Sequence, residues 1–150
     1  MRKLTLLLSF VLLTMFGAFA QSVDLSRGKG SGITLEGNTL ISNGGSYYLP
    51  EQSYANIKGI KLELTNFVKL DESAGGDLCK LNVIYINADG QEKKASMSFW
   101  VAGRKDIRFS EFKDGKEIIQ IDPASIKNIA LGMGADKKLN VSLELIPDKK

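Results

Sequence analysis

Histidine is absent from this 150-residue sequence, and that absence removes several kinds of chemistry at once. Without an imidazole there is no histidine general acid or base and no Ser-His or Cys-His nucleophile pair. Most zinc and copper sites also depend on histidine ligands. The sequence carries no nucleophile motif in compensation, so we predict that the protein is not an enzyme.

Cysteine occurs once, at Cys79, so the chain cannot form an intramolecular disulfide. A domain of this size can bury an adequate core without one. Cys79 stands at the start of an apolar strand pattern, which favours a buried, inert thiol over a nucleophile.

Long hydrophobic runs are missing except at the N-terminus. Arg2 and Lys3 precede the apolar run from Leu4 to Phe16, and the small-residue pattern Ala18-Phe19-Ala20 follows it. This order is typical of a secretory signal peptide of bacterial appearance, so we predict cleavage after residue 20 and export to the periplasm or the cell exterior. The run is too short for a retained anchor. We expect a single mature domain, residues 21–150, with no membrane insertion after cleavage.

Net charge is also low. The 20 Lys and Arg residues include Arg2 and Lys3, so 18 remain after cleavage, against 17 Asp and Glu. A balance so close to neutral gives no overall attraction to nucleic acid or anionic lipid. We therefore expect no nucleic-acid partner.

The sequence is rich in short segments in which apolar and polar residues alternate. The clearest are Ile60 to Phe67 and Leu139 to Ile146, and Ile33 to Ser42 has the pattern of a hairpin that turns at Gly37-Asn38. Glu117 to Asp122 and Ile126 to Leu131 are two further predicted strands, separated by a proline. Eight to ten short strands predict an all-β, antiparallel β-sandwich, of jelly-roll type.

The segment from Cys79 to Val101 predicts a hairpin whose register can be derived. A turn at Asn87-Ala88-Asp89-Gly90, with Gly90 left-handed and Asn87 paired with Gln91, separates core from surface side chains. A slip of one residue would mix them. The adopted register places Leu81, Val83, Ala95, Met97 and Phe99 in the core and Lys80, Asn82, Ser96, Ser98 and Trp100 on the opposite face.

This register sets the only tryptophan, Trp100, on a polar sheet face with Ser98, Ser96 and Asn82. An exposed indole stacks well against the C–H face of a pyranose, whose hydroxyls the neighbouring side chains can bind. Trp100, Asn82 and Ser98 are therefore candidate carbohydrate-binding residues. The alternative is that the indole fills a gap beneath a loop.

Three tyrosines, Tyr47, Tyr48 and Tyr54, cluster around the glycine-rich segment Asn43 to Ser46, which we interpret as a connection between strands. Loops at the ends of a sandwich often contact ligands, so the three are further candidate binding residues. In the alternative interpretation Tyr48 or Tyr54 packs beneath the loop and holds a backbone carbonyl.

The acidic residues Asp71, Glu72 and Asp77 flank a short Ser-Ala-Gly-Gly segment. Carboxylate oxygens suit calcium, which makes this a candidate metal site, although the spacing does not match an EF-hand. A solvated acidic turn is the alternative, and we predict no other cofactor. Nothing in the sequence places two carboxylates across a cleft, as a glycosidase requires.

The C-terminal third resembles galactose-binding-like jelly-roll domains, which include several families of carbohydrate-binding modules. The similar segments are Ile107 to Phe112, Ile121 to Ile129 and the closing strand Leu139 to Ile146. The resemblance implies a jelly-roll fold and a non-catalytic role in carbohydrate recognition. The rival hypothesis is an envelope or accessory protein that docks another protein, with Ile84, Ile86 and Trp100 in one apolar patch.

Overall fold

The computed structural model describes residues 21–72, 78–113 and 116–148. The predicted signal peptide, residues 1–20, lies outside these ranges. Apart from two short 3-10 helices, η1 (Leu25–Arg27) and η2 (Pro123–Ser125), the regular structure described consists of β-strands. The all-β, antiparallel prediction is confirmed. No helix within the described ranges has the length and apolar character needed to cross a bilayer.

Eight strands form one continuous antiparallel sheet, and two more form a separate hairpin. The sheet contains β1 (Gln21–Ser22), β2 (Lys29–Glu36), β3 (Thr39–Tyr48), β4 (Ile57–Lys69), β5 (Leu78–Ile86), β6 (Glu92–Trp100), β7 (Gly103–Arg108) and β10 (Ile126–Pro147). The hairpin consists of β8 (Ser110–Lys113) and β9 (Lys116–Gln120).

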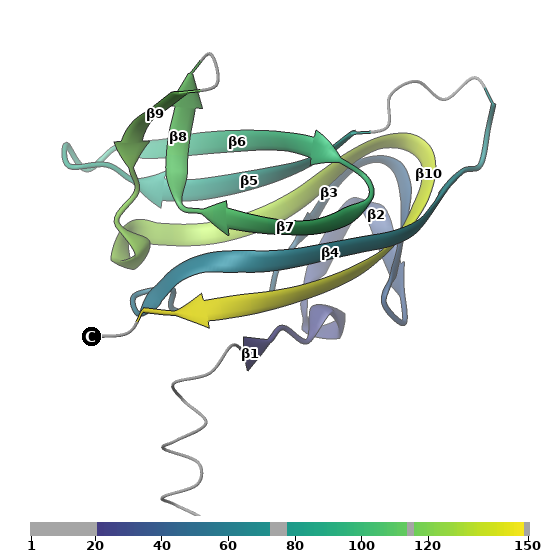
Figure 1. Ribbon diagram of the computed structural model, residues 1–150, viewed down its shortest axis with the longest axis horizontal. Helices are drawn as coiled ribbons and strands as arrows, with labels where there is room; N and C mark the ends of the chain where they lie inside the picture. The colour runs from purple at the N-terminus through teal and green to yellow at the C-terminus, as the bar shows by residue number, and fades with distance from the viewer. Residues whose placement is uncertain (1–20, 73–77, 114–115, 149–150) are drawn as a thin grey trace, which may run out of the picture.

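Strand β10 folds the sheet over into two layers. Its first arm, up to Ala135, pairs with β3 and β5, whereas its second arm, from Lys137, pairs with β4 and with the start of β3. The arms meet at a bulge where Asp136 has a φ of 60°. Figure 1 shows β10 curving back on itself, so that β6, β5 and its first arm lie above β7, β4 and its second arm. We call these layers the upper and lower sheets.

The prediction of two separate strands at Ile126 to Leu131 and Leu139 to Ile146 is therefore wrong. They belong to one strand of 22 residues. Backbone pairing with β3 continues from Ala130 to Asn140 and shifts only at the bulge. Asp136, which has no partner in the β3 register and lies in the left-handed region, bends the strand without ending it.

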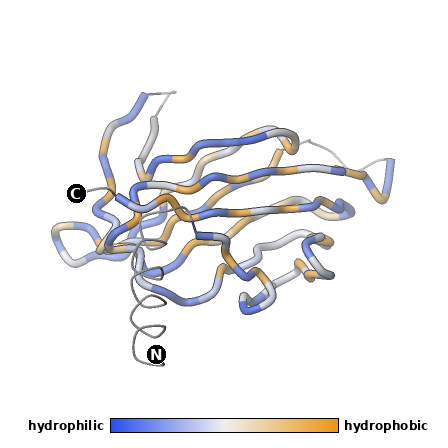
Figure 2. The backbone as a smooth tube through the Cα atoms, turned by 60° about the horizontal axis from the view of Figure 1, so that its bottom comes forward, coloured by the Kyte–Doolittle hydropathy of each residue, from blue (hydrophilic) through white to orange (hydrophobic). Residues whose placement is uncertain are grey.

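The core lies between the two layers, and the predicted alternation places the side chains there. In β4, Ile60, Leu62 and Leu64 are buried while Lys61 and Thr65 are exposed. The second arm of β10 alternates in the same way, and Figure 2 shows hydrophobic and hydrophilic positions alternating along the strands. The inward-facing leucines and isoleucines are the main contribution to stability, at about 1.5–3 kcal/mol for each fully buried side chain.

The predicted register of the β5–β6 hairpin is confirmed. Asn87 donates its backbone N–H to the Gln91 carbonyl at 2.9 Å, and Gly90, at φ 77°, donates to the Asn87 carbonyl at 3.0 Å. Val83 then lies opposite Ala95, and both are buried. The β2–β3 hairpin also turns as predicted, with Leu35 opposite Leu40.

The glycine-rich segment Asn43 to Ser46 is not a loop, contrary to the prediction. It lies inside β3, where the strand bends with the sheet. A Cβ atom on Gly45 would stand 1.9 Å from the carbonyl oxygen of Ser31, so the close approach of β2 requires glycine here. Gly44 has a φ of 93°, which glycine adopts readily.

Candidate functional site

The outer face of the upper sheet collects most of the polar residues that the sequence predicts for a site. Residues directly opposite each other in an antiparallel pair lie on the same face of the sheet. Asn82 of β5 is opposite Ser96 of β6 and Ala130 of β10, and Ala130 is in turn opposite Tyr48 of β3. We define the outer face by these residues: Lys94, Ser96, Ser98, Trp100, Leu78, Lys80, Asn82, Ile84, Asn128, Ala130, Gly132, Ser46 and Tyr48.

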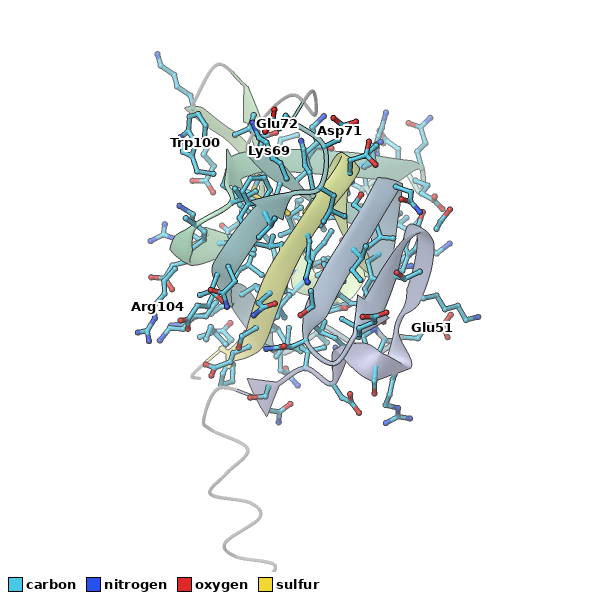
Figure 3. All side chains as sticks on the ribbon, turned by 90° about the vertical axis from the view of Figure 1, so that its right-hand side faces the viewer. Glu51, Lys69, Asp71, Glu72, Trp100 and Arg104 are labelled. Atoms are coloured by element: carbon cyan, nitrogen blue, oxygen red, sulfur yellow. The ribbon has the colours of Figure 1, made fainter. Side chains whose placement is uncertain are left out.

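Trp100 stands at one end of this face and is 66% exposed. It is the last residue of β6, opposite Leu78, which is 42% exposed. Figure 3 shows the indole projecting from the edge of the molecule. The interpretation in which Trp100 fills a gap beneath a loop does not hold, because the ring is mostly in solvent.

A groove of about 350 Å³ runs over the same face. Its floor is formed by Gly132 and Gly134 of β10, and Lys80 and Asn82 rise beside it from β5. The groove exists because these β10 positions have no side chain. A Cβ atom at Gly132 would meet nothing closer than 3.5 Å, so the fold itself has room for a larger residue there.

Asn82 is held in place by its neighbour across the hairpin. The hydroxyl of Ser96 donates to Oδ1 of Asn82 at 2.6 Å. With its oxygen engaged, Asn82 directs its Nδ2 toward the groove, 3.7 Å from where a Cβ of Gly132 would stand. The amide hydrogens are thus available as donors to a ligand. Ser98 is exposed on the same face, opposite Lys80.

Tyr48 is the one member of the tyrosine group that reaches the outer face. It is half-buried and lies opposite both Ala130 and Lys29. It also borders a second depression of about 770 Å³ at the end of the sandwich, which Asp24 and Glu51 line as well. Tyr48 therefore lines the end depression, whereas Ser46, two residues before it in β3, lines the groove.

Tyr47 and Tyr54 lie in the core, 4% and 2% exposed, so neither ring offers a face to a ligand. The hydroxyl of Tyr47 donates to the carbonyl oxygen of Leu25. The pKa of this hydroxyl is raised, mainly by burial and to a smaller extent by the negative charge of Asp24. Tyr54 packs edge to face on Phe109, with ring centroids 6.3 Å apart, and burial raises its pKa too. The alternative interpretation expected Tyr48 or Tyr54 to hold a backbone carbonyl beneath a loop. The hydroxyl that does so belongs to Tyr47, and the neighbouring glycine segment is an exposed part of β3.

The acidic segment is only partly described. Asp71 and Glu72 are exposed at the end of β4, near Lys69 in Figure 3, whereas Asp77 lies outside the described residues. Among the described residues, no group of three or more His, Cys, Asp or Glu side chains is placed to hold a metal ion. Calcium binding at this segment therefore stays a prediction.

Cys79 is fully buried, and burial raises the pKa of its thiol to about 12. A thiol of this kind is protonated at physiological pH and does not act as a nucleophile. The prediction of an inert cysteine agrees with this environment.

The sequence did not reveal the groove or the part that Lys80, Gly132 and Lys94 play in it. Alternation correctly placed Lys80 on the polar face, but the groove depends on β10 lying between β5 and β3. Those pairings join residues about 50 and 85 positions apart, and no local pattern marks them.

The solved structures that this chain matches include the following two. One is PfGH50B, with a TM-score of 0.46 and 15% identity, and the other is the agarase AgWH50C, with a TM-score of 0.43 and 12% identity. Each alignment covers 88% of this chain but only 24% and 25% of those chains, so this chain spans about a quarter of their length. No protein-family model and no curated protein matches the sequence.

Proposed function

We propose that this chain is an exported, non-catalytic domain that binds carbohydrate on the outer face of the upper sheet. The fold type that we propose is a jelly roll of the galactose-binding-like kind. The observation that carries the proposal is the 66% exposure of Trp100 on a polar sheet face. Trp100 supplies the stacking surface, and Asn82, Ser98 and Tyr48 supply hydrogen bonds.

An exposed indole has an energetic cost that supports a binding role. Large aromatic side chains dominate the burial energy of cores and interfaces, and each buries about 150–250 Å². A ring left in water contributes little of this to folding, so the free energy remains available for a ligand. A sugar ring suits the site because its apolar face meets the indole while its hydroxyls meet Ser98, and Asn82, four residues along the hairpin, can bind a further sugar of the same chain.

The hydrogen bonds of Asp24, which lines the end depression, suit a helix cap rather than a general acid. Asp24 accepts hydrogen bonds from the backbone N–H and the hydroxyl of Ser26, which lower its pKa. The acid residue of a glycosidase needs a raised pKa instead. Asp24 therefore serves as the N-cap of η1.

The rival function, docking of another envelope or accessory protein, has one observation in its favour. Leu78 and Trp100 are neighbours across the hairpin and are both exposed. The larger patch that we predicted for this rival is wrong: Ile84 and Ile86 are half-buried. Ile84 lies six residues along the hairpin from Trp100, about 20 Å at the rise of a strand.

Affinity electrophoresis through gels that contain single polysaccharides tests the proposal. We expect at least one polysaccharide to retard the mature protein, Trp100→Ala to lose at least about ten-fold in affinity, and Trp100→Phe to keep part of it. The control is Ile119→Ala, which removes an exposed apolar side chain from β9, outside the outer face. Retardation that Trp100→Ala leaves unchanged would remove Trp100 from the site, and capture of a stoichiometric protein partner by the Trp100–Leu78 pair would favour the rival.

A further inference from the structure

The side chains that line the groove carry an excess of positive charge. Of the described residues that line it, two are lysines, Lys80 and Lys94, and none is a carboxylate. Both lysines are exposed, and neither forms an ion pair within the described part of the chain. The nearly neutral total charge of the mature chain conceals this local excess.

The nearest carboxylate on β6 does not compensate for these lysines. Glu92 stands two residues before Lys94, and its carboxylate is 3.3 Å from the Nζ of Lys127. Glu92 is thus already paired at the turn end of the hairpin. Toward Trp100, the residues of β6 on this face are Ser96 and Ser98.

Hydrogen-bond donors also predominate over acceptors among the groups that line the groove. The two ammonium groups can only donate, and the amide oxygen of Asn82 is occupied by Ser96. The amide nitrogen of Asn82 adds further donors beside Gly132. The hydroxyls of Ser46 and Ser96, which also line the groove, can donate or accept. Because donors predominate, a ligand rich in acceptors suits the groove, and anionic oxygens accept more strongly than hydroxyls.

The spacing of the charges indicates a polymer. Lys80 is opposite Ser98 and Lys94 is opposite Ile84, four residues further along the hairpin. At about 3.4 Å per residue the two lysines are about 14 Å apart along the strands, and Trp100 lies about 7 Å beyond Lys80. The two charges are thus spread along the length of the hairpin, an arrangement that suits a chain carrying repeated anionic groups.

We infer that the outer face binds an anionic polysaccharide, which lies along β5 and β6 with one sugar on Trp100 and its sulfate or carboxylate groups on Lys80 and Lys94. This inference rests on the proposed carbohydrate-binding function and specifies the class of ligand. Both kinds of anionic group present acceptor oxygens to the same donors. Sulfated and uronic-acid glycans are therefore separate arms of the test.

The experiment measures affinity for four probes: κ-carrageenan as a sulfated glycan, polygalacturonate as a carboxylated one, pectic galactan as a neutral one, and long-chain polyphosphate as an anion without sugar. The variant is Lys80→Gln with Lys94→Gln, which keeps length and polarity but removes both charges. The control is Lys61→Gln with Lys138→Gln, two exposed lysines on β4 and on the second arm of β10. It changes the net charge equally but leaves the outer face intact.

We expect the mature protein to bind one of the two anionic glycans at least about ten-fold more tightly than the neutral one at low salt. The groove variant should lose about ten-fold, since each exposed charge pair is worth roughly a factor of three, while the control variant should bind as the unmodified protein does. Trp100→Ala should weaken glycan binding and leave polyphosphate binding unchanged. Added salt should weaken the anionic arm by more than the neutral arm.

Several outcomes would overturn the inference. Equal affinity for neutral and anionic glycans, with the groove variant unaffected, would refute the charge assignment and leave carbohydrate binding standing. If the groove variant and the control variant lost affinity equally, the effect would be one of general electrostatics. The same would hold if polyphosphate bound as tightly as the glycans. Failure of every glycan to bind would refute the proposed function itself, together with the inference built on it.

Discussion

Residues of the same chemical type have opposite roles in this protein, and exposure decides between them. Tyr47 and Tyr54 are in the core, whereas Tyr48, one residue after Tyr47, lies on the outer face. Successive side chains of a strand point to opposite sides of the sheet, so the two neighbours are separated by the backbone. Aromatic residues close in sequence are therefore not one cluster in space.

Cys79 gives a prediction at this scale that depends on pH. Its pKa in the folded protein, about 12, lies above the ordinary value of 9.0 because the thiol is buried. Below pH 9 the thiol is protonated in both the folded and the unfolded chain. Above pH 9 the unfolded chain loses the proton first, so stability from this group falls as the pH rises toward 12, by about 1 kcal/mol per pH unit.

Urea unfolding of the unmodified protein and of Cys79→Ala, at pH 8 and above pH 10, measures this effect. The stability advantage of cysteine over alanine should shrink at the higher pH. Both proteins contain the same tyrosines and lysines, so the titration of those residues cancels in the difference. An advantage independent of pH, or a thiol that reacts with Ellman's reagent as fast in buffer as in urea, would show that Cys79 is accessible.

The exposure of Trp100 followed from sequence, since one glycine fixed a register. Gly90 in a left-handed turn conformation sets which residues of β6 face the core, and Trp100 then falls on the other side. The tyrosines were different. Their interpretation relied on Asn43 to Ser46 being a loop, and glycine at a strand bend has the same local signature as glycine in a turn.

At the scale of elements, glycines shape the sheet in two distinct ways. Gly90 closes a turn at φ 77°, and a Cβ there would meet nothing within 4 Å. Gly45 lies in β3 and permits the carbonyl of Ser31 to approach. The first requirement concerns backbone conformation, and the second concerns space.

Alanine substitutions separate these two requirements. Gly90→Ala should lower the free energy of unfolding by about 1–2 kcal/mol, the cost of a left-handed L-residue. Gly45→Ala should cost more, since its Cβ would stand 1.9 Å from a backbone oxygen and β2 must move away. Denaturant midpoints of the two variants test this order, and an equal or smaller effect at Gly45 would mean that β2 and β3 are not so closely apposed.

The long strand β10 marks the limit of what local pattern predicts about elements. Alternating residues identified each of its two arms, but they did not indicate that the two arms form one continuous strand. Gly132, Gly134 and Asp136 between them are residues typical of a turn. Pairing with β3 on one side keeps that segment extended, and this long-range contact outweighs local preference.

At the scale of the whole molecule, β10 joins the two layers into one structural unit. Its first arm pairs with β5 and its second arm with β4, so neither layer is complete without it. Composition and alternation predicted two packed layers because a single flat sheet would leave an apolar face in water. The order of strands, and hence the groove on the outer face, depends on pairings between distant segments that the sequence does not mark locally.

Because both layers share β10, we expect one cooperative unfolding transition. Leu131→Ala in the first arm and Leu143→Ala in the second each remove a buried side chain and should cost about 2–5 kcal/mol. In both variants, far-ultraviolet circular dichroism and Trp100 fluorescence should give the same midpoint. Separate midpoints in either variant would mean that the layers unfold independently.

The central claim is that the single exposed indole is the contact surface for a sugar. Trp100 is the only tryptophan, so the intrinsic tryptophan fluorescence of the protein reports on this residue alone. The most direct measurement is a titration of the mature protein with soluble glycans, followed by tryptophan emission and by acrylamide quenching. We predict a saturable change in emission, with the indole protected from acrylamide when glycan is bound. We also predict that calorimetry finds the glycan affinity of Trp100→Ala to be at least about ten-fold lower. Emission and quenching that stay unchanged while a glycan binds would contradict the claim.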